Sequence, residues 1–293
     1  VSTKGNTLTI KKLPRKPWTI TDFIANKTIT SEVAALVWQL IQYEGNLVVS
    51  GGAGSGKTSL LQACLQFIQP SHKIVSVEDA RELVLPESLH WMPFVAHESD
   101  SSAVTLHDLM TNALKMKPER LVVVEIRKES AGKLFDAMQA HAVYTTLNAD
   151  TAEHAIKRLA DAPILLPKNQ LEAIDLLLVT HRDRRLGSRK VTEVAEIVPV
   201  STEGSSETTT RANIIYKWMP SSGTLEENSP AVKLFEKLSL HTGLSEPELR
   251  EDLADKKKIL EWMVKNKISD LEQVGKTIAE YYRNPKSNIF KDI

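Results

Sequence analysis

A glycine-rich segment at residues 51–58, GGAGSGKT, has the residue types and spacing that bind phosphate groups. It matches G-x-x-x-x-G-K-[ST] and lies between an apolar run at 46–52 and a helical pattern that begins at Lys57. Glycines let consecutive backbone N–H groups turn toward an anion, and the helix N-terminus adds positive potential. The alternative, a glycine-rich turn before an ordinary helix, does not account for the complete pattern. We therefore predict that Lys57 contacts the β- and γ-phosphates of ATP and that the Thr58 hydroxyl binds Mg²⁺. The predicted nucleotide-binding residues are Gly51, Gly52, Ala53, Gly54, Ser55, Gly56, Lys57, Thr58 and Ser59.

Two carboxylates end apolar strand patterns and are candidates for the chemistry beside a bound triphosphate. Glu125 follows the run LVVV, and Glu78 ends KIVSVE. Hydrolysis needs a carboxylate near the metal and a group that orients water. We expect Glu125 to bind Mg²⁺ and Glu78 to polarise the attacking water, with a solvated or structural strand-end role as the alternative for each.

Several basic residues are candidates for neutralising charge in the transition state. His141, at a helix end before a strand, is a candidate phosphate sensor, although a lone histidine more often packs. For any single arginine, an exposed surface position is the alternative. The candidate arginines are Arg81, Arg120, Arg127, Arg182, Arg184, Arg185 and Arg189.

The elements that must position these side chains alternate between strands and helices. Nearly continuous apolar strands separated by helices predict an α/β fold, with a mostly parallel sheet covered on both faces. Two alternating stretches predict an antiparallel hairpin, and residues 7–13 predict a short strand. Strands are expected at 46–52, 73–78, 121–126, 142–147 and 175–180, the hairpin at 190–198 and 212–218, and helices from Ser31 and at 57–69, 105–116, 130–141 and 151–161.

Three regions are expected along the chain. Residues 1–19 are interpreted as the remnant of an upstream domain and a linker, and 20–225 as the phosphate-binding domain. Residues 226–293 are expected to form a helical appendage that packs on the core, with capping boxes that begin helices at Ser245 and Ser269.

Composition limits the classes of function. The 293 residues contain 37 Lys+Arg and 37 Asp+Glu, and only 5% are aromatic, which argues against a nucleic-acid partner. Cys64 is the single cysteine, so an intrachain disulfide and a multi-cysteine metal site are excluded and a cytoplasmic setting is favoured; we expect it to be buried. The longest uncharged apolar stretch, 33–43, is about half as long as a bilayer span, so no direct membrane insertion is expected.

The order of four motifs resembles the Walker A, Asp box, Walker B and His box of the type II/type IV secretion-ATPase superfamily. This resemblance covers about residues 8–220 and is most similar to the archaeal pilus and archaellum branch. It implies a RecA-like P-loop motor domain in a homo-hexamer, with ATP bound next to a preceding domain and force passed to a membrane platform protein, peripherally at the inner face of the cell membrane. The motifs are GGAGSGKTS, IVSVEDARELVLP, LKMKPERLVVVEIR and AMQAHAVYTTLNADTAEHAIKRL.

The resemblance assigns Glu125 and Arg127 to Walker B and His141 to the His box. The Asp box contains Glu78, Asp79 and Arg81. Some positions depart from the superfamily's pattern. The superfamily usually has one glycine before the Walker B acid and another after its arginine, where this chain has Val124 and Lys128. It also usually has a glycine before the first histidine of the His box and a second histidine farther on, where this chain has Ala140 and Asn148. An asparagine can hydrogen-bond a phosphate but cannot carry a proton.

The leading hypothesis is an ATPase that powers the assembly or secretion of pilin-like subunits. An ATP-binding regulatory paralogue with slow or no hydrolysis is the first alternative, suggested by Asn148. A nucleic-acid translocating ATPase is the second alternative, for which the arginines at 182–189 are the one supporting feature.

Overall fold

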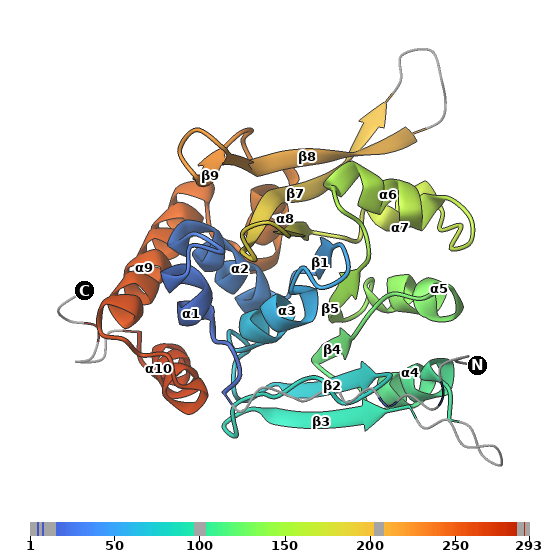
Figure 1. Ribbon diagram of the computed structural model, residues 1–293, viewed down its shortest axis with the longest axis horizontal. Helices are drawn as coiled ribbons and strands as arrows, with labels where there is room; N and C mark the ends of the chain where they lie inside the picture. The colour runs from blue at the N-terminus through green and yellow to red at the C-terminus, as the bar shows by residue number, and fades with distance from the viewer. Residues whose placement is uncertain are drawn as a thin grey trace.

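The computed structural model describes residues 5, 8, 16–96, 104–201, 208–285 and 290. Within them the backbone forms one nine-stranded sheet in the order β3-β2-β4-β5-β1-β6-β7-β8-β9, with helices on both faces (Figure 1). The predicted strand at 7–13 lies outside the described residues, apart from Leu8. The strands are β1 (Leu47–Gly51), β2 (Lys73–Glu78), β3 (His90–Val95), β4 (Arg120–Val123), β5 (Ala142–Leu147), β6 (Leu176–Arg182), β7 (Arg189–Ser201), β8 (Thr208–Met219) and β9 (Thr224–Glu227).

The sheet is parallel from β3 through β6 and antiparallel from β6 to β9. This arrangement confirms the predicted α/β class and the hairpin of β7 and β8, which is longer than expected. The sequence patterns did not predict β3 or β9. In addition, β4 ends at Val123 and not at residue 126, because the backbone at Glu125 has a positive φ of 70° and leaves the extended conformation.

Most helices begin at a residue whose side chain caps them. The Thr30 hydroxyl accepts from the Val33 N–H at 3.2 Å, so α2 is capped one residue before the region expected from Ser31. The capping box at Ser245 is confirmed, whereas Asp270 caps the last helix in place of Ser269. The helices are α1 (Ile20–Ala25), α2 (Ser31–Gln42), α3 (Lys57–Leu65), α4 (Leu106–Lys115), α5 (Lys128–Ala137), α6 (Ala152–Ala160), α7 (Lys168–Leu171), α8 (Lys233–Thr242), α9 (Glu246–Lys265) and α10 (Leu271–Arg283).

Two hydrophobic cores cover the two faces of the sheet. One core contains buried side chains of α1, α2 and α3 together with α8, α9 and α10, and Cys64 is fully buried in it, as predicted. The other contains side chains of α4, α5, α6 and α7. Figure 1 shows these two groups of helices on opposite sides of the sheet. Among the described residues, no helix combines the length and the apolar character needed to cross a lipid bilayer.

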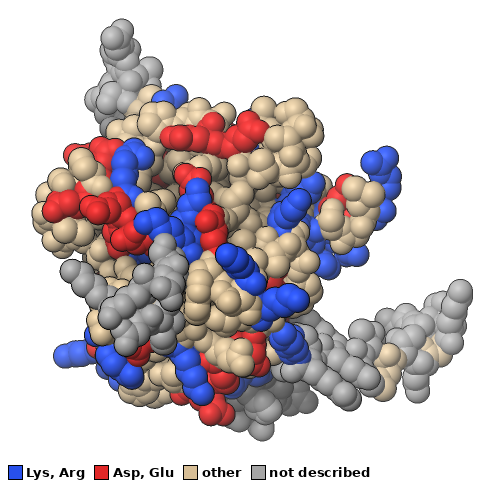
Figure 2. Space-filling view, turned by 90° about the vertical axis from the view of Figure 1, so that its left-hand side faces the viewer, with Lys and Arg blue, Asp and Glu red and all other residues tan. Residues whose placement is uncertain are grey.

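The C-terminal helices share a core with α3, the helix that follows the glycine-rich phosphate-binding loop at residues 51–58 (the P-loop). Apolar residues of α9 and α10, including Leu260 and Ile278, are buried with those of α2 and α3, which confirms the expected packing on the core. The expected boundary at residue 225 falls inside β9. On the face of these helices, acidic and basic side chains are interspersed (Figure 2).

A buried polar network joins α9 to α2. The Lys256 side chain is completely buried and pairs with the Asp252 carboxylate. Asp252 also accepts from Gln39 Nε2 at 2.8 Å and from the Tyr281 hydroxyl at 3.1 Å. Burial lowers the pKa of Lys256, and the nearby Asp252 charge opposes that shift. The carboxylate therefore compensates a buried ammonium group whose other hydrogen-bond partner, the Tyr281 hydroxyl, is neutral.

We predict that Asp252→Ala lowers the free energy of unfolding by about 3–5 kcal/mol, because it leaves the Lys256 ammonium buried without its partner. Urea denaturation measures the change. The matched control is Asp255→Ala, which breaks an exposed pair with Lys258 and should cost less than about 1 kcal/mol. Equal losses in the two variants would contradict this assignment.

Candidate functional site

The carboxyl ends of three adjacent parallel strands place the candidate residues at one edge of the sheet. In the register, β1 pairs with β5 and β5 pairs with β4. The P-loop at Gly51, the acid Glu125 and the polar residue Asn148 therefore follow neighbouring strands. Ligands of open parallel sheets bind at this edge, so the site lies where the fold favours it.

The P-loop backbone requires glycine at specific positions. Gly51, Gly54 and Gly56 have φ values of 153°, 72° and 95°. A Cβ atom at Gly51 would lie 2.3 Å from the Thr180 carbonyl oxygen, and one at Gly52 would lie 2.6 Å from a carboxylate oxygen of Asp150. Side chains are thus excluded at these glycine positions of a loop that leads directly into the N-terminus of α3, as a cradle for phosphates requires.

Strands β6 and β7 support this loop from the side. The Ser55 and Thr180 hydroxyls hydrogen-bond at 2.9 Å, and Thr180 also donates to the Ser50 carbonyl at 2.9 Å. Arg189 donates from Nε to the Gly54 carbonyl at 3.0 Å. A Cβ at Gly54 would lie 3.2 Å from Nη1 of Arg182. Two of the candidate arginines therefore lie beside the P-loop of the same chain.

Lys57 is linked to Glu125 through Asn148. The Lys57 ammonium donates to the Gly52 carbonyl at 2.9 Å and to Asn148 Oδ1 at 2.7 Å. The amide nitrogen of Asn148 donates to the Glu125 carboxylate. Burial lowers the pKa of Lys57, while the charges of Glu125 and Asp150 act in the opposite direction. The Asn148 side chain thus hydrogen-bonds both the Lys57 ammonium and the Glu125 carboxylate.

The backbone around Glu125 is shaped to point its side chain into the site. Its left-handed conformation is uncommon for a residue other than glycine, and its N–H donates to the Thr146 hydroxyl at 3.0 Å. Thr58, in the first turn of α3, is half-buried, whereas Ser59 is exposed. A hydroxyl from α3 and a carboxylate from the β4 end suit Mg²⁺, which prefers oxygen ligands and keeps several waters. The residues present therefore fit a magnesium nucleotide.

Glu78 lies in a different environment from the one expected for a water-polarising base. Its side chain is fully buried, and one carboxylate oxygen accepts from the backbone N–H groups of Glu82 and Leu83 at 2.8 and 2.9 Å. The other oxygen accepts from the Ser76 hydroxyl at 3.1 Å. This geometry holds the segment after β2 in place, and the role of Glu78 in hydrolysis stays a prediction.

The two Asp-box and Walker B arginines make different contacts. Arg127 pairs with the Asp79 carboxylate, which connects the ends of β4 and β2. Arg81 stacks on the Trp91 ring with 4.6 Å between its guanidinium carbon and the ring centroid, and it donates to the Leu83 carbonyl at 3.3 Å. Neither contact reaches the P-loop of the same chain, so a catalytic role for these arginines remains a prediction.

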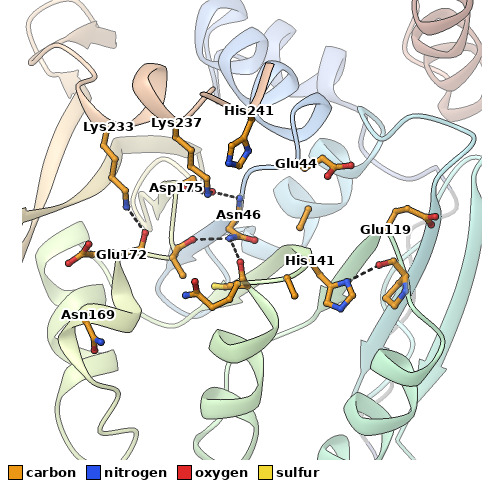
Figure 3. A pocket seen from close by; sticks show the side chains of 16 residues that line it. Glu44, Asn46, Glu119, His141, Asn169, Glu172, Asp175, Lys233, Lys237 and His241 are labelled. Carbon is orange, nitrogen blue, oxygen red and sulfur yellow. Dashed lines mark hydrogen bonds and ion pairs between the residues drawn. The ribbon is translucent and has the colours of Figure 1, made fainter. Parts of the chain in front are cut away.

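His141 does not lie with the P-loop. It precedes β5, whereas the P-loop lies at the carboxyl end of the strands, about 20 Å away at ~3.3 Å per residue. Its Nδ1 hydrogen-bonds the Pro118 carbonyl at 3.0 Å. It lines a polar cavity of about 770 Å³ at the amino ends of the strands, into which Lys233, Lys237 and His241 also extend (Figure 3). His141 therefore lies away from the P-loop of its own chain, and its role as a phosphate sensor stays a prediction.

Sequence reasoning gave no site role to Asn148 or Asp150, whereas it named Arg182 and Arg189 as candidates for neutralising charge. Asn148 was noticed only as a departure from the His box. The signal that could have found Asn148 and Asp150 is their position immediately after the apolar strand 142–147, which neighbours the P-loop strand.

Comparison with known proteins decides the family. The sequence profile described as "Type II/IV secretion system protein" matches residues 1–215. This chain belongs to that family. The resemblance to the secretion-ATPase superfamily is thereby confirmed, and it agrees with the α/β sheet and its P-loop.

Relatives of this family member come from archaea and bacteria. It is 33% identical over 96% of its length to MJ0900 of Methanocaldococcus jannaschii, covering 52% of that protein, and 30% identical over 89% to MJ1287, covering 97%. The chain thus spans about half of the first relative. Type IV secretion system protein PtlH of Bordetella pertussis is 32% identical over 49% of the chain and 47% of PtlH. The VirB11 ATPase structure from Brucella suis aligns with a TM-score of 0.47 at 24% identity, over 63% of this chain and 64% of VirB11.

We predict that Glu78→Leu lowers the free energy of unfolding by about 1–3 kcal/mol, since an apolar side chain leaves the N–H groups of Glu82 and Leu83 without their acceptor. Chemical denaturation tests this, with Glu87→Leu as a control at an exposed position of the same segment. A role limited to polarising water would leave stability unchanged while removing turnover, and that result would rule out the loop-holding assignment.

Proposed function

We propose that this chain hydrolyses ATP as the motor domain of a machine that assembles or secretes pilin-like subunits. The observation that carries the proposal is the link from Lys57 through Asn148 to Glu125 beside the glycine cradle, in a member of the type II/IV secretion system family. Phosphoryl transfer needs a cationic group that binds the phosphates and a carboxylate near the metal. Lys57 and Glu125 are these two groups in our proposal.

Each residue has a defined task in this proposal. The backbone N–H groups of the P-loop and the ammonium of Lys57 bind the β- and γ-phosphates. Thr58 and Glu125 hold Mg²⁺, which neutralises charge on the phosphate oxygens when it is bound. Glu125 also orients the water that attacks the γ-phosphorus, because Glu78 is occupied by backbone amides in this structure. Water adds to phosphorus as the bridging oxygen departs with ADP.

The hairpin between β6 and β7 supplies positive charge from the same chain. Arg182 and Arg189 are exposed and lie beside Gly54 and Gly56 at the P-loop. A bound triphosphate carries several negative charges at this loop, so both guanidinium groups can contact it and stabilise it. We assign these two arginines to nucleotide binding.

Assembly and location extend the same proposal. We infer a homo-hexamer that works in the cytoplasm at the inner face of the membrane, where it passes force to a membrane platform protein. Support comes from the family itself and from a relative named as a type IV secretion system protein. Movement between subunits, driven by the nucleotide, would explain why Arg81 and Arg127 do not contact the P-loop of their own chain.

A second candidate is an ATP-binding regulatory paralogue. Asn148 favours it, because an amide stands where the superfamily has a titratable histidine. The two candidates differ in turnover and not in binding, so measurements of both distinguish them.

We predict that Lys57→Ala raises the dissociation constant for Mg-ATP by about 100-fold, because charged hydrogen bonds to phosphate contribute about 1.5–3 kcal/mol. Glu125→Gln should retain binding while phosphate release falls by at least about 100-fold. Fluorescent-nucleotide titration measures the first effect, and a phosphate-release assay measures the second.

Glu129→Gln, at an exposed position in the first turn of α5, is the matched control and should behave like the unaltered chain. Binding with no measurable turnover in the unaltered chain would favour the regulatory paralogue. Unchanged binding in Lys57→Ala would remove the P-loop site from consideration.

A further inference from the structure

Asn148 uses both ends of its amide on two groups of opposite charge. Its Oδ1 accepts from the Lys57 ammonium at 2.7 Å, and its Nδ2 donates to the Glu125 carboxylate. An ammonium group only donates and a carboxylate only accepts, so the orientation of the amide is determined by its partners. A symmetric carboxylate or an apolar side chain at this position could not satisfy both.

We infer that Asn148 is a positioning residue for the proposed hydrolysis, which aligns the Glu125 carboxylate and holds Lys57 ready for the phosphates. This inference rests on the proposed function. It assigns to Asn148 a role that acts through Glu125 and Lys57, at the position where the sequence departs from the His box.

The two partners of Asn148 depend on it to different degrees. Among the described residues, the Asn148 amide is the one hydrogen-bond donor to the Glu125 carboxylate. The Thr146 hydroxyl binds only the backbone N–H of Glu125, so it does not orient the carboxylate. Without Asn148 the carboxylate can rotate away from the metal and water.

Lys57 has a second partner and needs Asn148 less. Its ammonium also donates to the Gly52 carbonyl at 2.9 Å. An incoming phosphate must compete with Asn148 for the same ammonium protons. Removal of the amide therefore takes away a competitor and leaves Lys57 beside the P-loop.

Loss of Asn148 should consequently separate turnover from binding. We expect Asn148→Leu to lower kcat by about 10- to 100-fold, the range found when a group that orients a metal ligand is removed. The dissociation constant for ATP measured in EDTA should be unchanged or smaller. A general collapse of the site would instead weaken both.

The experiment compares Asn148→Leu with Asn148→Asp, which has nearly the same size as asparagine. The aspartate keeps an acceptor for Lys57 but faces the Glu125 carboxylate with a like charge. We expect kcat to fall in both variants, and ATP binding in EDTA to weaken at least threefold only in Asn148→Asp, because its charge holds Lys57 and repels the phosphates. Asn169→Leu, at an exposed position at the opposite end of the strands, is the control. Thermal unfolding confirms that each variant is folded.

Retention of kcat within threefold in Asn148→Leu would overturn the inference, and so would a parallel loss of kcat and of ATP affinity in that variant. Absence of hydrolysis in the unaltered chain would instead overturn the proposed function. In that case the affinities for ATP in EDTA still test whether the side chain at position 148 competes with phosphate for Lys57. Equal affinities in the leucine and aspartate variants would exclude that competition.

Discussion

The parallel pairing of β4, β5 and β1 is the constraint on which the candidate site depends. Backbone hydrogen bonds between these strands bring Gly51, Glu125 and Asn148 to one edge of the sheet, although they are distant in sequence. The strands end in different ways: one enters a glycine loop, one turns through a left-handed residue, and one presents an amide. The site is therefore a property of strand order and register, and the side chains act on geometry that the backbone has already set.

The segment after β2 connects this edge with the C-terminal helices. Glu78 binds the backbone of the segment, and Val84 N–H donates to Gln62 of α3 at 2.9 Å. Farther along, Glu87 N–H donates to Glu272 of α10 at 3.1 Å, and Pro86 packs against Gly275 so closely that an added Cβ would lie 2.8 Å away. A continuous set of contacts thus runs from the P-loop helix to α10.

Sequence patterns predict the local features of this protein well and its long-range proximities less well. The P-loop motif predicted the turn at Gly56 because the conformational demand of that turn is local. His90–Val95 was missed as a strand because its central proline and mixed polarity hide the period of two. His141 precedes β5, as the sequence indicates, but its distance from the P-loop depends on the parallel direction of β1 and β5, which its own motif does not reveal. Asn148 acquires its meaning only from Lys57 and Glu125, which approach it through the tertiary fold.

The most direct test of the account is steady-state phosphate release from Mg-ATP by the purified chain over a series of protein concentrations. The account predicts release that requires the P-loop and whose rate per chain rises with concentration as subunits associate. Release no faster than that of the Lys57→Ala chain at every concentration would contradict the claim that this edge of the sheet hydrolyses ATP.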